Sequence, residues 1–198
     1  MVDAISRIIT NVLTALYQTF WFSILTSILF MFLYLYVKDR GWRNVLRYWI
    51  ISFKTSSKFR RIFIFVFFTI MILMRTLLNR YVWMSPLSNI MGGWSLIDAE
   101  GNLTTEPIEN TLLMIPFTSL LLCAFREKLI EKKRMLESVL LGLRFGFCFS
   151  FVIESLQLFF RLGTVQLADL FFNSFGGAIG GFIYYIYFKF NRKKQHKD

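Results

Sequence analysis

Residues 154–181, ESLQLFFRLGTVQLADLFFNSFGGAIGG, decide the fold and the candidate site of this chain. Inside two long apolar runs, this stretch carries the polar side chains Glu154, Gln157, Arg161, Asp169 and Asn173. Charged groups in lipid are costly and commonly serve a function. The stretch therefore predicts membrane helices that hold a polar site.

The composition of the 198 residues excludes an ordinary soluble domain, because 56% are hydrophobic and 19% are aromatic. A net charge of +11 is also found in nucleic-acid-binding proteins. Here, 18 of the 23 Lys and Arg residues lie in three segments that flank apolar runs, at 38–61, 126–134 and 189–197. The charge therefore indicates membrane topology, and no nucleic-acid partner is expected. Two cysteines and one histidine indicate no metal site and no cofactor.

Five apolar runs are long enough to cross about 30 Å of hydrocarbon. They predict an all-α, polytopic membrane helix bundle that forms one domain over residues 1–198. The approximate transmembrane helices are 11–37, 62–84, 110–125, 135–160 and 170–188. The third run contains Pro116, so a re-entrant segment is the alternative. The loop 85–109 has four acidic residues and no Lys or Arg, whereas 126–134 has five basic residues, so this run is expected to span.

The same charge rule places the N-terminus outside and the C-terminus inside. The start of the chain is not expected to be a cleavable signal, because Asp3 is acidic and the first apolar run exceeds a secretory h-region. The loop 85–109 then lies outside, where it either caps the site or is an ordinary exposed loop.

A basic amphipathic helix is expected between the first two spans. Its apolar face comprises Trp42, Leu46, Trp49, Ile50 and Phe53, and its basic face comprises Arg43, Arg47, Lys54, Lys58 and Arg61. Such a helix lies on the inner leaflet. It either recognises anionic lipid or only connects two spans, and the second interpretation is favoured because basic juxtamembrane segments are general.

This topology also assigns a depth to each intramembrane polar residue. Glu154 is expected roughly 9 Å below the outer boundary at about 1.5 Å per residue. The polar residues expected at that level are Arg75, Arg80, Glu154, Gln157, Arg161, Asp169 and Asn173. They predict a polar cavity open to the outside. The alternative is an ion-pair network that fixes helix register, for instance Arg75 with Glu154 and Arg161 with Asp169. Arg144 lies deeper, near Glu137, and its role stays open.

Glycines in the last run predict close helix packing. Gly176, Gly177, Gly180 and Gly181 form two overlapping GxxxG pairs, which let another helix approach closely. Asp169, Asn173, Gly176 and Gly180 share a stripe, so the expected neighbour of this polar pair is the fourth span. The glycines would then position the site without forming it.

Two blocks of sequence resemble the VanZ-like membrane proteins. One is the run from Glu154 to Gly177, and the other is the NTLLMIPF run from Asn110 to Phe117. The resemblance covers residues 62–188, a VanZ-like core. Thr118 departs from it, because glycine is expected there in many relatives. The positions that match the family's motifs are Asn110, Pro116, Phe117, Glu154, Gln157, Arg161, Asp169, Asn173 and Gly177.

The resemblance implies a multi-pass protein of the bacterial cell membrane that gives low-level resistance to teicoplanin-type lipoglycopeptide antibiotics. In one mechanism, the cavity binds or shields an amphiphile at the outer leaflet, with membrane lipids, the antibiotic or a lipid-linked wall precursor as partners. In the other, an intramembrane enzyme modifies a lipid or glycan headgroup, with Glu154 and Asp169 as candidate catalytic carboxylates. Transport is less favoured, because no inverted repeat is visible. The sequence does not determine the oligomeric state.

Overall fold

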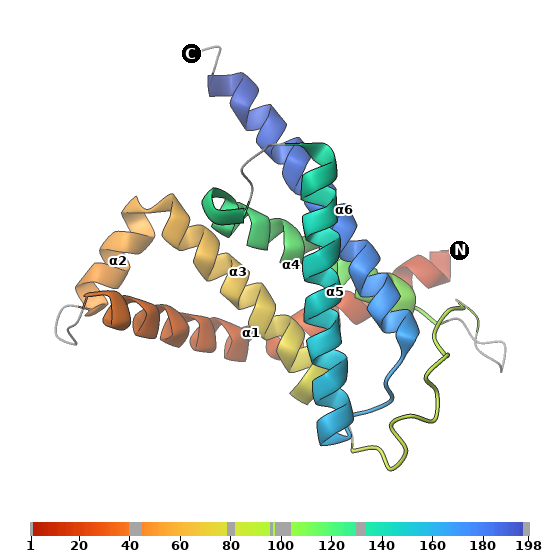
Figure 1. The fold of residues 1–198 in the computed structure, drawn as a ribbon. Coiled ribbons are helices and arrows are strands. Elements are labelled where there is room, and N and C mark those ends of the chain that lie inside the picture. The colour runs from red at the N-terminus through yellow and green to blue at the C-terminus, as the bar shows by residue number, and fades with distance from the viewer. Residues whose placement is uncertain are drawn as a thin grey trace.

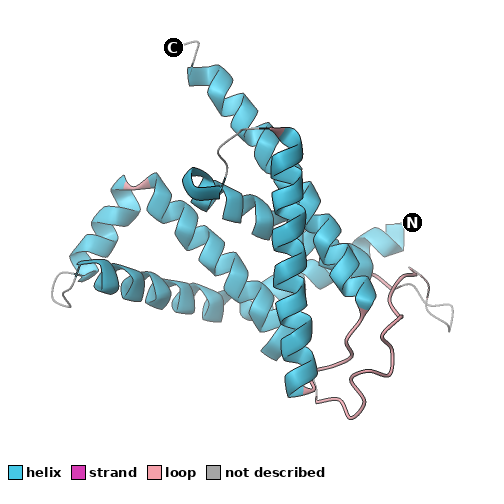
Figure 2. Cartoon of the chain, in the orientation of Figure 1, coloured by secondary structure: helices cyan, strands magenta, loops and turns pink. Residues whose placement is uncertain are grey.

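The chain folds as helices, and a long non-helical connection includes the described residues 82–95, 97 and 104–105 (Figures 1 and 2). The computed structural model describes residues 2–39, 45–78, 82–95, 97, 104–129 and 134–195. The helices are α1 (Val2–Asp39), α2 (Val45–Thr55), α3 (Ser57–Leu73), the π-helix η1 (Met74–Leu78), α4 (Glu106–Leu129), α5 (Met135–Phe160) and α6 (Leu167–Gln195). Within these described ranges there is no β-strand; isolated bridge positions occur, and one of them pairs Val82 with Leu162. The all-α prediction is confirmed.

Three helices of the described part are long and apolar enough to cross a membrane. They are Ile5–Tyr36 within α1, Glu106–Phe125 within α4, and Met135–Phe160, which is α5. The predicted third span, 110–125, is therefore helical through Pro116, and α4 kinks at the last residue of that span, Phe125. These helices agree with a membrane protein, as the composition predicted.

The predicted second span, 62–84, is wrong at its end. The α3 helix gives way to the π turn at Met74, and Val82–Met84 form no helix. The backbone of Val82 pairs with Leu162 instead, and the Trp83 N–H donates to the Arg161 carbonyl at 2.8 Å. Other helices extend beyond the predicted spans, because backbone hydrogen bonding continues through polar residues at helix ends. The α1 helix begins at Val2, α4 at Glu106 and α6 at Leu167.

A helix follows the first span as predicted, but its aromatic face points inward. In α2, Trp49 stacks on Phe53 and on Phe32 of α1, and Phe59 of α3 packs edge-on against it. Leu46 and Ile50 are exposed. The predicted apolar face is therefore divided between the protein core and the outside.

The basic face of this helix is also shorter than expected. Lys58 and Arg61 belong to α3, because Ser56 ends α2 and caps the next helix by accepting the Phe59 N–H at 3.2 Å. Trp42 and Arg43 lie outside the described residues. Position on the inner leaflet stays a prediction.

The α6 helix packs against both α4 and α5 through different glycines. A Cβ atom on Gly177 would lie 2.4 Å from the Gly142 carbonyl oxygen of α5. A Cβ atom on Gly176 would lie 2.3 Å from the Thr111 carbonyl oxygen of α4. Such distances require near backbone contact, so both helix pairs are closely packed as predicted.

The segment 82–94 lies along the turn that connects α5 to α6, at the lower end of the molecule in Figure 1. The Val165 N–H donates to the Pro86 carbonyl at 2.9 Å, and the Leu167 N–H donates to the Ile90 carbonyl at 3.0 Å. Trp94 packs on Phe171, with ring centroids 5.3 Å apart. This part of the predicted outer loop is therefore fixed to the start of α6.

Candidate functional site

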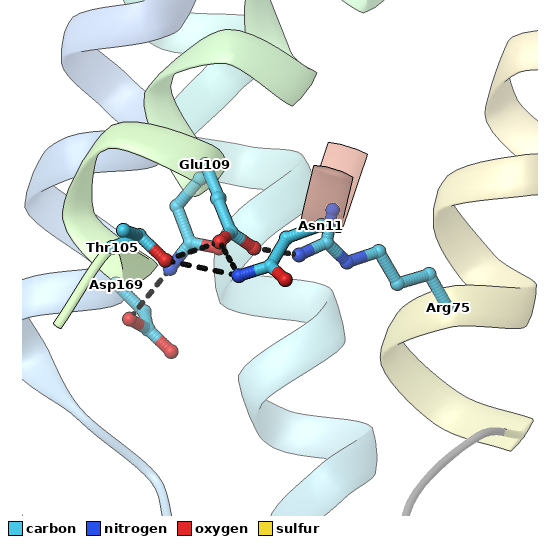
Figure 3. Close-up of polar contacts among 6 residues, drawn as sticks. Asn11, Arg75, Thr105, Glu109 and Asp169 are labelled. Carbon is cyan, nitrogen blue, oxygen red and sulfur yellow. Dashed lines mark hydrogen bonds and ion pairs between the residues drawn. The ribbon is translucent and has the colours of Figure 1, made fainter. Parts of the chain in front are cut away.

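A buried carboxylate, Glu109 in the first turn of α4, joins three parts of the chain (Figure 3). One oxygen, Oε1, accepts hydrogen bonds from Asn11 Nδ2 at 2.9 Å and from Thr105 Oγ1. The other, Oε2, forms an ion pair with Arg75 Nη2. Asn11 Nδ2 also donates to Thr105 Oγ1 at 3.2 Å. Both carboxylate oxygens are thus occupied, and α1, η1 and α4 meet at this residue.

Arg75 lies in the π-helical turn. A π turn changes the side-chain spacing of a helix and is frequent at functional sites. The neighbouring Thr76 carbonyl accepts a hydrogen bond from Gln157 Nε2 of α5 at 2.8 Å. The π turn is therefore held from α4 through Glu109 and from α5 through Gln157. The second guanidinium nitrogen of Arg75, Nη1, is buried and donates to none of the described residues.

Asp169 lies in the first turn of α6 and contacts the first motif block. Its Oδ1 accepts a hydrogen bond from Asn110 Nδ2 of α4 at 2.7 Å (Figure 3). Thr111 of α4 extends the contact between the two helices by donating to the Phe172 carbonyl at 3.3 Å. The two sequence blocks that resembled one family thus touch each other through Asn110 and Asp169.

Glu154 and Asn173 tie α5 to α6. The Glu154 carboxylate is buried and accepts the Gln166 backbone N–H, with Oε2 at 3.3 Å. Asn173 Nδ2 donates to Ser150 Oγ at 2.8 Å, and both residues are buried. Glu154 therefore helps to hold the turn before α6, while Asn173 holds the centre of the helix pair.

The suggested ion pairs were wrong. Arg75 pairs with Glu109 and not with Glu154. Arg161 ends α5 with its backbone in the left-handed region, at φ of 56°, and its side chain is exposed. Asp169 instead accepts a hydrogen bond from Asn110. Arg161 acts here through its backbone, whose carbonyl accepts the Trp83 N–H. Arg80 lies outside the described residues.

The sequence reasoning missed three members of the network, Asn11, Thr105 and Glu109. Glu109 was counted only as an acidic loop residue. The signal for its true place was the run Thr105-Glu106-Pro107, because Thr favours a helix cap and Pro the first helical turn. Asn11 carried a weaker signal, since it is a polar side chain at the edge of an apolar run.

The predicted packing block lies beside this network. Phe117 is buried and stacks on Phe149 of α5 with ring centroids 4.1 Å apart. Thr118, where glycine was expected, is fully buried and donates to the Gly177 carbonyl at 3.1 Å. A Cβ on Gly180 would lie 2.0 Å from Thr118 Oγ1. The threonine thus occupies the space that Gly180 leaves, and Pro116 lies within the same continuous helix.

No three His, Cys, Asp or Glu side chains converge as metal ligands in the described ranges. The charged groups of the site are Arg75 and Glu109, which form an ion pair, and the carboxylates Glu154 and Asp169, which accept hydrogen bonds. This arrangement suits the binding of polar groups and offers no metal-ligand set.

We expect Asn173→Ala to lower the free energy of unfolding by about 1 kcal/mol, because it leaves the buried Ser150 hydroxyl without its partner. Ser150→Ala should cost more, because a buried amide is harder to leave unpaired than a hydroxyl, which can bond its own helix. Thermal unfolding in detergent measures both. Equal stability of wild type and both variants would mean that this hydrogen bond contributes nothing.

A family model described as VanZ/LLP1 matches residues 4–188 of the chain. No curated protein and no solved structure matches it. The match includes both motif blocks and the first helix, which supplies Asn11 to the network.

Proposed function

The chain belongs to the VanZ/LLP1 family, and from this we propose that it gives a bacterium low-level resistance to teicoplanin-type lipoglycopeptide antibiotics. Residues 4–188, which the family model covers, contain every polar side chain of the network. In this proposal the protein binds or shields an amphiphile at the outer leaflet of the cell membrane. The amphiphile is the antibiotic or a lipid-linked wall precursor.

The proposed topology has five spans, with the N-terminus outside and the C-terminus inside. Three helices meet the length and hydropathy of a span, and α3 with η1 and α6 supply the other two. The support is the charge pattern, because the acidic loop before α4 and the basic segment after it are expected on opposite sides of the membrane. The network then faces the outer leaflet, because it lies where α4 and α6 begin and where η1 and α5 end.

The observation that carries the proposal is the buried Nη1 of Arg75. A guanidinium has donors in a fixed fork, and a buried donor without a partner is unfavourable. Arg75 uses Nη2 for Glu109, which leaves Nη1 for another acceptor. A phosphate, carboxylate or sugar hydroxyl of the amphiphile would supply that acceptor. Asn110 and Asp169, hydrogen-bonded to each other close by, would meet its other polar groups.

The enzyme alternative has weaker support. A general base must lie within reach of the proton that it removes. Each candidate carboxylate instead has a structural role: Glu109 binds Arg75, Asn11 and Thr105, Glu154 accepts a backbone N–H, and Asp169 accepts from Asn110. A mass spectrum of envelope lipids with and without the protein separates the two mechanisms, because an enzyme leaves a new or missing covalent species.

The proposal is tested by Arg75→Lys, assayed for resistance in a teicoplanin-sensitive host. Lysine keeps a positive charge for Glu109 but has no second nitrogen in a fork. We therefore expect normal membrane abundance with resistance lost. Arg47→Lys, on an exposed position of α2, is the matched control and should keep resistance.

Full resistance of Arg75→Lys at normal abundance would contradict the binding site at Arg75. It would leave the ion pair with Glu109 as a device that only holds the helices in register. Single substitutions of Glu154, Arg161 and Asp169 extend the same test to the motif residues. Because the Arg161 side chain is exposed, it is the one among these whose loss should not change stability.

A further inference from the structure

Arg144 lies on the face of α5 that points away from the helix pair. Gly142 and Gly146 of the same helix face α6. Arg144 lies two residues from each of them, which is a rotation of about 200° around the helix axis. Arg144 is exposed and forms no hydrogen bond or ion pair with any residue that the structure describes. Its exposed neighbours on this face are apolar: Leu140, Leu143, Phe147 and Phe151. Arg144 is therefore a cation whose nearest exposed neighbours on the helix are apolar.

A guanidinium surrounded by hydrocarbon is unfavourable, so it turns toward the headgroups or meets an anion. Side chains of an α-helix lean toward the helix N-terminus. Arg144 therefore leans toward Met135, where α5 begins after the basic segment 126–134. If α5 crosses the membrane, the lipid phosphates nearest to Arg144 lie toward this end of the helix. The orientation of the helix thus directs Arg144 to a lipid phosphate.

Glu137 adds an opposite charge to the same face. It precedes Arg144 by seven residues, which is a rotation of about 20° and a rise of about 10 Å. Glu137 is half-buried and has no ion-pair partner among the described residues. From the helix end inward, the face therefore presents a carboxylate first and a guanidinium second. An aminophospholipid presents the complementary order, with its ammonium outside its phosphate.

The apolar part of the face continues from Arg144 into the span. Phe147 and Phe151 are exposed and stacked, with ring centroids 6.3 Å apart. They follow Arg144 by one and two turns and lie deeper in the hydrocarbon. Such rings offer a surface for an acyl chain of the lipid whose phosphate is at Arg144.

We propose that this face of α5 binds one aminophospholipid, with the phosphate at Arg144, the primary ammonium at Glu137 and an acyl chain along Phe147 and Phe151. The site lies on the opposite side of α5 from Gly142 and Gly146, and it is independent of the resistance proposal. Phosphatidylcholine has no N–H donor for Glu137, and phosphatidylglycerol has no cation. The site therefore selects phosphatidylethanolamine among these three lipids.

Native mass spectrometry of the purified full-length protein tests the site, with the three lipids added at equal concentration. Wild type should retain phosphatidylethanolamine at least several-fold more than the other two. Glu137→Gln should lower that lipid to the level of phosphatidylcholine. Arg144→Gln should lower retention of all three roughly tenfold, the effect of losing one charge-assisted hydrogen bond. Lys54→Gln, an exposed charge on α2, should change nothing.

Equal retention of the three lipids by wild type would overturn the proposal, as would unchanged retention by Arg144→Gln. A third contradicting result is a dimer mass that Arg144→Gln converts to a monomer without loss of lipid, because a second copy would then cover this face. Arg144→Lys retains the charge and should keep most phospholipid binding. This variant distinguishes loss of the phosphate contact from general damage to the helix.

Discussion

Replacing Gly177 with alanine is expected to separate α5 from α6 and remove most folded protein from the membrane. The added Cβ would lie 2.4 Å from the Gly142 carbonyl oxygen and 3.0 Å from the Gly146 Cα atom. Backbone atoms cannot rotate away as side chains do, so the helices must move apart. Overpacking of this kind costs about 1–3 kcal/mol and occasionally more. Membrane abundance and the midpoint of thermal unfolding in detergent measure the effect.

Gly92→Ala is the control for this substitution. The three atoms nearest to a Cβ on Gly92 all belong to the side chain of Asn89, which is exposed and can rotate away. We expect its stability to be within about 0.5 kcal/mol of wild type. If Gly177→Ala were as stable as Gly92→Ala, the helix pair would not depend on glycine contact, and the close packing of α5 on α6 would be wrong.

Glu109→Ala is the second substitution with a large expected effect. It leaves the Arg75 guanidinium without its ion-pair partner, and removing one member of a buried pair costs about 3–5 kcal/mol. It also removes the acceptor shared by Asn11 and Thr105, so at the start of α4 Asn11 keeps only its hydrogen bond to Thr105. Unfolding in detergent should therefore occur at a clearly lower temperature, and resistance should be lost.

Two further variants show whether charge is the cause. Glu106→Gln alters an exposed carboxylate in the same turn of α4 and should behave as wild type. The double variant Arg75→Gln with Glu109→Gln removes both charges and should recover most of the stability that Glu109→Ala loses. Its resistance should not recover, because the guanidinium is absent. A double variant no more stable than Glu109→Ala would show that the ion pair is not what Glu109 contributes.

The sequence was sufficient for the helical class and for the close packing at the glycines, but not for the partner of each glycine. At about 100° per residue, Asp169, Gly176 and Gly180 fall within about 40° of one another, and Asn173 lies only about 20° farther round. These four look like one stripe in the sequence. In the structure, Asp169, Gly176 and Gly180 face α4, whereas Asn173 and Gly177 face α5. A helix that packs between two neighbours presents the residues of one stripe to different helices. The helical period alone does not show which residue faces which neighbour.

The polar network was predicted in part, since Arg75, Asn110, Gln157 and Asp169 all make polar contacts between helices. Its centre, Glu109, was assigned to a loop, because charge counting treats an acidic residue at a helix start as solvent-exposed. The ion-pair partner of Arg75 was predicted wrongly for a different reason. The π turn at Met74–Leu78 breaks the regular spacing from which the direction of Arg75 would be inferred, and nothing local in the sequence marks it.

Direct ligand binding tests the central claim, that the polar network around Arg75 holds an amphiphile. Purified wild-type and Arg75→Lys proteins in nanodiscs would be titrated separately with teicoplanin and with a purified lipid-linked wall precursor. We predict that wild type binds at least one of them, and that Arg75→Lys binds it roughly tenfold more weakly through loss of one charge-assisted hydrogen bond. Equal dissociation constants for the two proteins, or no binding of either ligand to wild type, would contradict the claim.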